Sequence, residues 1–189
     1  MQMKKIAALT SILIATGMVS FASAAETASA TISSTPLGGG EFQYNIALKN
    51  TSTTSIGTFW FSWIPGYDFM NASPTSITAP TGWIAPVTGP DFPGDGYAIE
   101  YYNIDGSADQ LAPGATDNFS FDSTETLAQL EGPTTFIPSD TGLTSFVYAG
   151  FPETDAGFQF SVTPVVPEPV SAAIFAASAA ALALRRRRA

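Results

Sequence analysis

The sequence predicts an all-β fold, an antiparallel β-sandwich, between two terminal segments of different composition. Several short runs place apolar residues at every second position, which is typical of strands with one buried face. The 16 glycines and 14 prolines divide the chain into segments too short for long helices. Because the chain has no cysteine, no disulfide holds the sheets together, and the fold must rest on its hydrophobic core.

The first 24 residues have the composition of a secretory signal peptide. Lys4 and Lys5 precede an apolar run over residues 6–19. Ala22 and Ala24 place small residues at the positions that signal peptidase reads. We therefore expect signal peptidase to cleave after Ala24 and the rest of the chain to be exported.

Residues 25–164 are predicted to form the exported sandwich domain. Residues 41–49 alternate strictly between apolar and polar side chains, whereas residues 55–64 are apolar on both faces and predict a covered central strand. Residues 125–130 are a candidate short helix. Further short strands are predicted at residues 97–102, 118–123, 145–150 and 157–162. The expected core contains Phe42, Tyr44, Ile46, Trp60, Phe119, Phe121, Phe158 and Phe160.

The charge of this domain excludes one class of partner. Between Glu26 and Val165 there are fifteen acidic residues and one basic residue, Lys49. A surface this acidic repels phosphate backbones, so we expect no nucleic-acid partner. The acidity has two interpretations, solubility outside a cell or binding of a divalent cation.

Four aspartates are the candidate metal ligands: Asp91, Asp95, Asp105 and Asp109. Calcium takes six to eight oxygen ligands from flexible loops. Their spacing matches no EF-hand loop, however, and aspartate before glycine is also what a plain turn requires. No other cofactor is expected, and the choice between calcium and turns stays open.

Composition also limits the chemistry. The chain has no histidine and no cysteine, which excludes a Ser-His pair, a cysteine nucleophile and a zinc site built on those ligands. Lys49 ends a strand, where a solvated surface position is expected. Two carboxylates could support a glycosidase, but no acidic pair on facing strands is recognisable. We therefore expect the protein not to be an enzyme.

The three tryptophans suggest carbohydrate binding as an alternative function, because exposed indoles stack on sugar rings. Trp60 and Trp63 should point to opposite faces of one strand unless that strand is bulged, so core packing is expected for both. Trp83 follows Pro80-Thr81-Gly82 in a loop-like segment and is the candidate for an exposed carbohydrate-binding residue.

The C-terminal segment predicts a single transmembrane helix. Residues 170–184 contain no charge and would span about 22 Å as a helix, against about 30 Å for the hydrocarbon layer. Four arginines follow at the end of the chain and should stay on the cytoplasmic side of the membrane. They are Arg185, Arg186, Arg187 and Arg188.

The tail resembles a known sorting signal. Val166, Pro167, Glu168 and Pro169, then the short apolar helix and the arginines, are similar to the PEP-CTERM signal of exported proteins in Gram-negative bacteria that make exopolysaccharide. The resemblance implies an inner-membrane-anchored precursor, cleavage near Glu168 by the membrane protease exosortase, and delivery to the cell surface or extracellular matrix. It covers the last 24 residues.

Within the exported domain, Leu111-Ala112-Pro113-Gly114-Ala115-Thr116 before a Phe-x-Phe strand resembles bacterial immunoglobulin-like domains, which implies an immunoglobulin-like sandwich of seven or eight strands. The domains expected are thus a signal peptide (1–24), the sandwich (25–164) and the sorting signal (165–189). The predicted function is a non-enzymatic structural or adhesive surface protein. The alternative is an extracellular polysaccharide-binding module, with or without calcium.

Overall fold

The computed structural model describes residues 26–91, 95–104, 106, 108–135, 137–150 and 155–165. The predicted signal peptide, Asp105 and all of the predicted sorting signal after Val165 lie outside the described residues. Within these described ranges, no helix combines the length and the apolar character that crossing a membrane requires.

The described residues form thirteen strands and one short helix, which confirms the all-β prediction. The first seven strands are β1 (Ala28–Gly38), β2 (Glu41–Asn50), β3 (Thr58–Phe61), β4 (Trp63–Ile64), β5 (Tyr67–Asp68), β6 (Thr75–Thr78) and β7 (Trp83–Ile84). The others are β8 (Val87–Thr88), β9 (Ala98–Asn103), β10 (Thr116–Ser123), β11 (Thr144–Tyr148), β12 (Phe158–Ser161) and β13 (Thr163–Pro164). The helix is α1 (Leu127–Leu130).

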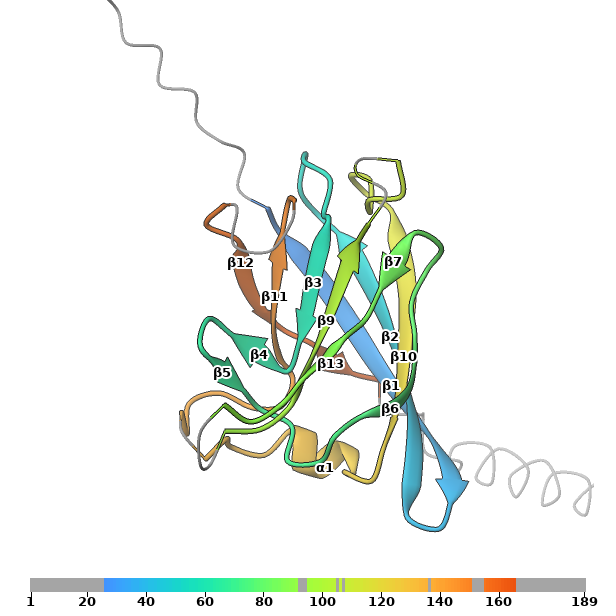
Figure 1. The fold of residues 1–189 in the computed structure, drawn as a ribbon, viewed down its shortest axis with the longest axis vertical. Helices are drawn as coiled ribbons and strands as arrows, with labels where there is room; N and C mark the ends of the chain where they lie inside the picture. The colour runs from blue at the N-terminus through green and yellow to red at the C-terminus, as the bar shows by residue number, and fades with distance from the viewer. Residues whose placement is uncertain are drawn as a thin grey trace, which may run out of the picture.

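Two sheets face each other in the sandwich (Figure 1). The five-stranded sheet has the order β13-β1-β2-β10-β6. The six-stranded sheet has the order β12-β11-β3-β9-β7, with β8 also paired to β9. All strand pairs are antiparallel except β1 and β13, which run parallel. A separate hairpin of β4 and β5 follows β3.

The alternation predicted for residues 41–49 places β2 correctly. Tyr44, Ile46 and Leu48 are fully buried, whereas Asn45 and Lys49 are exposed. β1 alternates in the same way, with small buried residues and exposed serine and threonine. A turn of three glycines, all with positive φ, joins the two strands and needs the freedom that only glycine has.

The core lies between the two sheets and is mainly aromatic. The ring of Phe59 in β3 lies 5.3 Å from that of Phe119 in β10, and Phe61 lies 5.1 Å from Phe121. Four of the predicted core residues are buried here: Tyr44, Ile46, Phe119 and Phe121. Three are only partly buried against this core: Phe42, Phe158 and Phe160.

Trp60 is buried, but on the outer face of the six-stranded sheet. β3 is therefore covered on both faces, as its sequence predicts. The alternation then breaks at Ser62, whose φ of 62° is unusual for a residue with a side chain. This local bulge brings Trp63 onto the same face as Trp60, with ring centroids 4.3 Å apart and nearly parallel planes. The expectation that the two indoles point to opposite faces is therefore wrong.

The predicted helix over residues 125–130 is confirmed in shorter form as α1. Thr126 caps it, accepting the backbone N–H of Gln129, while the Gln129 side chain accepts the backbone N–H of Thr126. This reciprocal pair stabilises a helix of a single turn. Tyr44 donates from its hydroxyl to the carbonyl of Glu125 at 2.6 Å, which ties the segment before α1 to the core.

Candidate functional site

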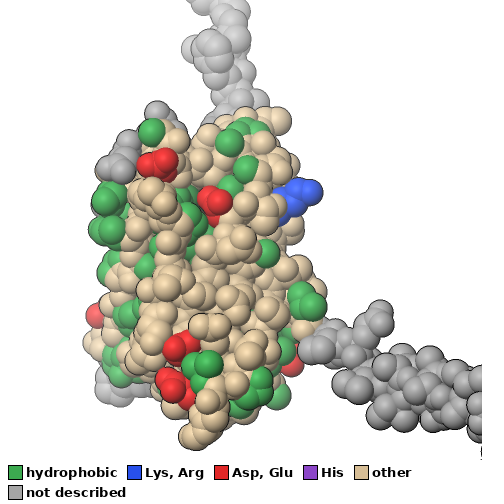
Figure 2. All heavy atoms as spheres, turned by 90° about the vertical axis from the view of Figure 1, so that its right-hand side faces the viewer, with side chains coloured by type: hydrophobic (Ala, Val, Ile, Leu, Met, Phe, Trp, Pro, Cys, Tyr) green, Lys and Arg blue, Asp and Glu red, His purple; other side chains and the backbone are tan. Residues whose placement is uncertain are grey.

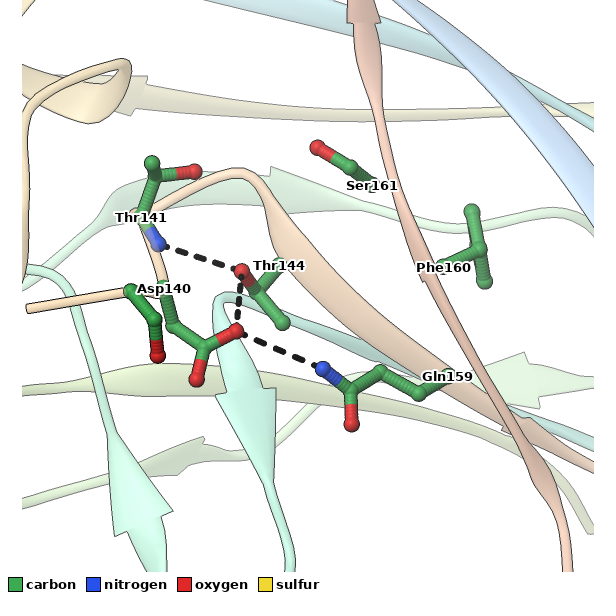
Figure 3. Close-up of a pocket in the computed structure, with 7 residues that line it drawn as sticks. Asp140, Thr141, Thr144, Gln159, Phe160 and Ser161 are labelled. Atoms are coloured by element: carbon green, nitrogen blue, oxygen red, sulfur yellow. Dashed lines mark hydrogen bonds between the residues drawn. The ribbon is translucent and has the colours of Figure 1, made fainter. Parts of the chain in front are cut away.

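A pocket of about 320 Å³ opens at the edge of the six-stranded sheet, between β12 and the turn that precedes β11. Polar side chains dominate its lining, which consists of Ser139, Asp140, Thr141, Thr144, Gln159, Phe160 and Ser161. Figure 3 shows Asp140, Thr144 and Gln159 converging, with Ser161 also bordering the pocket and Phe160 directed away from Gln159. We call this the Asp140 pocket.

Strand pairing positions these side chains. In β12, Gln159 and Ser161 are exposed, whereas Phe158 and Phe160 turn toward the core. The register sets Ser161 opposite Thr144 in β11. The outward face of two paired strands thus presents an amide and two hydroxyl groups to the carboxylate of Asp140.

Asp140 is the hydrogen-bond acceptor at the centre of the pocket. Its Oδ1 accepts from Thr144 Oγ1 and from Gln159 Nε2, each at 3.4 Å. Thr144 Oγ1 also accepts the backbone N–H of Thr141 at 3.1 Å, which fixes the hydroxyl in place. Bonds of 3.4 Å are long for this chemistry, so these groups can exchange them for shorter bonds to a ligand at little cost.

The chemistry of the lining suits a neutral ligand rich in hydroxyl groups. The carboxylate accepts, the amide donates and accepts, and serine and threonine do both. Of the described residues that line the pocket, Asp140 alone is charged. A volume near 300 Å³ is at the small end of ligand sites in proteins.

A second, smaller hollow of about 230 Å³ lies on the outer face of the five-stranded sheet. Ser29, Thr31, Ala47, Lys49 and Thr116 line it together with Ala30. Figure 2 shows basic side-chain atoms on one side of the domain, among polar atoms and scattered acidic groups. This surface has small side chains and no convergent set of polar groups comparable with the Asp140 pocket.

The structure separates the aspartates proposed as calcium ligands. Asp91 and Asp95 precede β9 and Asp109 follows it, so a strand of six residues, about 20 Å, lies between them. Asp95 Oδ1 accepts the backbone N–H of Asp68 at 2.9 Å, and its Oδ2 accepts that of Asp91 at 3.2 Å. These are turn-stabilising bonds. Across the described parts of the chain, no three acidic side chains are arranged to hold a metal ion.

Asp68 joins Asp91 and Asp95 at this end of β9, which sequence spacing does not reveal. Burial raises the pKa of Asp68 to about 6; a hydrogen bond with Thr88 opposes the shift, and the charges of Asp95 and Asp91 add to it. Asp68 belongs to β5 and is 7% exposed, so burial disfavours the charged form of its carboxyl group.

Trp83 is buried, and the expectation that it is exposed is wrong. It is 7% exposed, its ring packs edge-on against Phe119, and its Nε1 donates to the carbonyl of Asp109 at 2.7 Å. The reason is that the turn at Gly82 directs Trp83 inward as the start of β7. Trp83 offers no free indole face to a sugar.

Sequence reasoning missed the residues of the Asp140 pocket. Gln159 and Ser161 were recognisable as the polar face of an alternating strand, and Asp140 as part of a turn before Gly142. Nothing in their spacing shows that the turn folds over that strand. The missing information is the pairing of β11 with β12, which is set by the tertiary fold.

No protein-family model and no curated protein matches the chain. Among solved structures, an exo-β-N-acetylglucosaminidase of family GH20 from Vibrio harveyi superposes with a TM-score of 0.43 at 10% identity. The match covers 73% of this chain but 18% of that enzyme chain.

Two smaller proteins are also similar to parts of the chain. A CBM3 protein of Hungateiclostridium clariflavum superposes with a TM-score of 0.39 at 10% identity over 75% of this chain and 99% of its own. The chitin-binding domain of Chi18aC from Streptomyces coelicolor gives 0.29 at 30% identity over 51% of this chain and 78% of its own. At TM-scores below 0.5 these likenesses carry no argument about ligand or activity.

Proposed function

We propose that this chain is an exported, non-enzymatic surface or matrix protein whose sandwich domain binds a polysaccharide at the Asp140 pocket. The observation that carries the proposal is the convergence of Asp140, Thr144 and Gln159 at a strand edge. A polysaccharide presents many hydroxyl groups, each able to donate and to accept a hydrogen bond. These side chains include both acceptors and donors for such groups.

The position of the pocket supports a polymeric ligand. It opens along the edge of a sheet, and its lining comes from β11, β12 and one turn. A ligand bound there can continue past the strand edge on either side. A small metabolite, in contrast, is usually enclosed by its site.

The non-enzymatic part of the proposal rests on the carboxyl groups that line the pocket. Glycoside hydrolysis ordinarily needs two carboxyl groups flanking the scissile bond, one as acid and one as base or nucleophile. Asp140 is the one carboxylate among the described lining residues. The described lining can therefore orient a sugar, but it does not include the paired carboxylates that would cleave one.

The export and sorting part rests on the sequence. The signal peptide, the Pro167-Glu168-Pro169 motif, the apolar segment and the four arginines stand in the order expected for an exosortase substrate. We also propose that the sandwich domain belongs to the immunoglobulin-like class. In this proposal an inner-membrane precursor is processed near Glu168, and the domain then meets exopolysaccharide outside the cell.

The binding proposal is tested with the mature exported protein and a panel of immobilised polysaccharides, including the exopolysaccharide of the native cell. Asp140→Asn and Gln159→Ala should each weaken retention at least about tenfold, since the first removes the negative charge and one acceptor oxygen and the second removes the amide. Asn118→Ala, on the exposed face of the opposite sheet, is the matched control. Retention of both pocket variants at the wild-type level would overturn the proposal.

The same panel separates calcium-assisted from calcium-independent binding. Retention is measured with millimolar calcium and with a chelator. Asp140 is the one carboxylate among the described lining residues, whereas calcium takes six to eight oxygen ligands that commonly include several carboxylates, so we expect no difference between the two conditions. Loss of binding in chelator would instead show that a cation takes part.

A further inference from the structure

Four aromatic side chains form a second cluster outside the sandwich core. Trp60, Trp63, Phe146 and Tyr148 pack on the outer face of the six-stranded sheet, with Ala98 at their base. Trp63 lies flat on Trp60 and meets Phe146 edge-on, with ring centroids 5.9 Å apart. This face needs no aromatic cluster to close the sandwich, because the core lies on the other side of the sheet.

The aromatic cluster is continuous with the Asp140 pocket. Phe146 is the cross-strand partner of Gln159, which lines the pocket, and lies two residues beyond Thr144 on the same face of β11. Two residues of strand span about 7 Å. An extended ligand leaving the pocket along this face therefore reaches Phe146 and then Trp63.

Two buried polar atoms in this region have no hydrogen-bond partner among the described residues. They are Nε1 of Trp60 and Oγ of Ser62. Trp60 is 8% exposed and Ser62 is fully buried, so bulk water does not readily satisfy them. Buried donors and acceptors are nearly always paired in folded proteins, so each exception needs an explanation, and a partner supplied by a bound ligand is one such explanation.

The segment that covers the cluster belongs to neither main sheet. Trp63 begins β4, which pairs with β5 through two residue pairs, and the two strands form a separate sheet. At the base of this hairpin the Phe69 N–H donates to the Ser62 carbonyl at 2.9 Å. The Gly96 N–H donates to the Asp68 carbonyl at the same distance. The pairing within a two-stranded hairpin is only marginally stable by itself. The hairpin starts at Ser62, whose φ of 62° is strained, and local strain of this kind accumulates at binding and switching sites. In Figure 1 the hairpin lies beside the lower parts of β11 and β3.

We propose that Trp60 and Trp63 form a second sugar subsite that opens when the β4–β5 hairpin lifts, and that it takes a pyranose ring of the polysaccharide held in the Asp140 pocket. This inference rests on the function proposed above. Lifting Trp63 frees an indole face for stacking on the C–H face of a sugar. A ligand hydroxyl oxygen then accepts a hydrogen bond from Trp60 Nε1–H, which satisfies the unpaired donor.

The chemistry selects a class of ligand. A β-1,4-linked polymer of gluco-configured pyranose units has equatorial hydroxyl groups and flat C–H faces, so one unit can stack while its neighbour makes hydrogen bonds. The ligand must also be long enough to reach both subsites. A disaccharide can fill the Asp140 pocket alone, whereas a hexasaccharide can also reach the indoles.

Calorimetric titration of the mature protein with cellobiose and cellohexaose tests this. In the wild type, cellohexaose should bind at least about tenfold more tightly than cellobiose and should change the tryptophan emission. Trp60→Ala should remove the advantage of the longer ligand and leave cellobiose affinity unchanged. Trp60→Ala removes a large buried side chain, so a second and milder variant accompanies it. Trp60→Phe keeps a six-membered ring and loses the five-membered ring that carries Nε1, and it should lose part of the advantage. Ile84→Ala, exposed on the same sheet at β7, is the control.

The outcomes separate the two proposals. If cellohexaose gains nothing over cellobiose, or keeps its full advantage in both Trp60 variants, the aromatic subsite is refuted while the Asp140 pocket stands. If Asp140→Asn changes neither affinity, the pocket itself is refuted. If neither saccharide binds the wild type, the polysaccharide-binding proposal fails for this ligand class, and the subsite fails with it.

Discussion

Asp68 makes the stability of the domain depend on pH. Its pKa in the folded state is about 6, against 3.8 ordinarily, mainly because burial disfavours the charged form. Between pH 4 and 6 the folded protein therefore keeps a proton that the unfolded chain releases. The free energy of unfolding falls as the pH rises through this window and levels off above it.

Replacing Asp68 by asparagine should remove this loss. Relative to the wild type, Asp68→Asn should gain stability between pH 4 and 6, reaching at most about 3 kcal/mol at pH 7. Urea unfolding followed at several pH values measures the difference, with Asp109→Asn as the control at the other end of β9. If the free energies of unfolding of the wild type and of Asp68→Asn change in parallel between pH 4 and 6, the raised pKa of Asp68 is contradicted.

Phe59 is the residue on which core packing depends most directly. It is fully buried and contacts the rings of Tyr101 at 5.6 Å and Phe119 at 5.3 Å, so it joins strands of both sheets. Phe59→Ala should lower the free energy of unfolding by about 3–5 kcal/mol, since the cavity cannot collapse between rigid rings. Leu37→Ala, half exposed at the end of β1, should stay within about 0.5 kcal/mol.

At the scale of elements, the β4–β5 hairpin offers a matched pair of substitutions. Ser62 and Gly66 both have positive φ, 62° and 89°, but only glycine adopts such angles freely. Ser62→Gly should therefore stabilise the domain by about 1 kcal/mol, and Gly66→Ala should destabilise it by a similar amount. Chemical denaturation measures both, and effects of the same sign would show that backbone strain is not the cause.

Strands in which apolar and polar residues alternate strongly were predictable from the sequence. Strands whose alternate residues differ little in hydropathy were not. β2 combines tyrosine, isoleucine and leucine with polar neighbours, which gives an unmistakable period of two. β1 is just as regular, but it alternates alanine with serine and threonine, so its hydropathy contrast is too small to stand out. Strands of two residues, such as β7 and β8, exist only through pairing with β9.

The candidate site was less predictable than the fold, because its residues come together through tertiary pairing. Asp140 and Gln159 are 19 positions apart and meet only when β11 and β12 pair. The stacking of Trp60 on Trp63 depends on one residue, Ser62, in a conformation that serine rarely adopts. A period-two pattern assigns faces correctly only while the strand stays regular.

The export and sorting signals proposed for the two ends of the chain lead to a prediction about the mature protein. The protein recovered from the cell surface should lack Arg185 to Arg188 and most of the apolar segment, because arginines resist transfer across the bilayer and the proposed cleavage near Glu168 would remove them. Mass spectrometry of surface and medium fractions measures the C-terminus. Intact peptides ending at Ala189 would favour a plain membrane anchor.

A variant of the motif tests the same prediction in the cell. Replacing Pro167, Glu168 and Pro169 together by alanine should hold the full-length form in the inner membrane. Substitution of Thr163, in β13 just upstream, is the control for a general effect on export. If the triple variant is shed at the normal rate, the motif serves only as a linker.

The parallel pairing of β13 with β1 determines how the domain responds to a mechanical load. Tension applied to the chain after Val165 enters the sandwich through β13, which is attached to β1 by two residue pairs and by the Val165 N–H to Ile32 carbonyl bond at 2.7 Å. β1 itself is secured to β2 by ten residue pairs. A pull from the C-terminal side therefore detaches β13 first and lengthens the tether by a few residues, while the two sheets and their core stay closed.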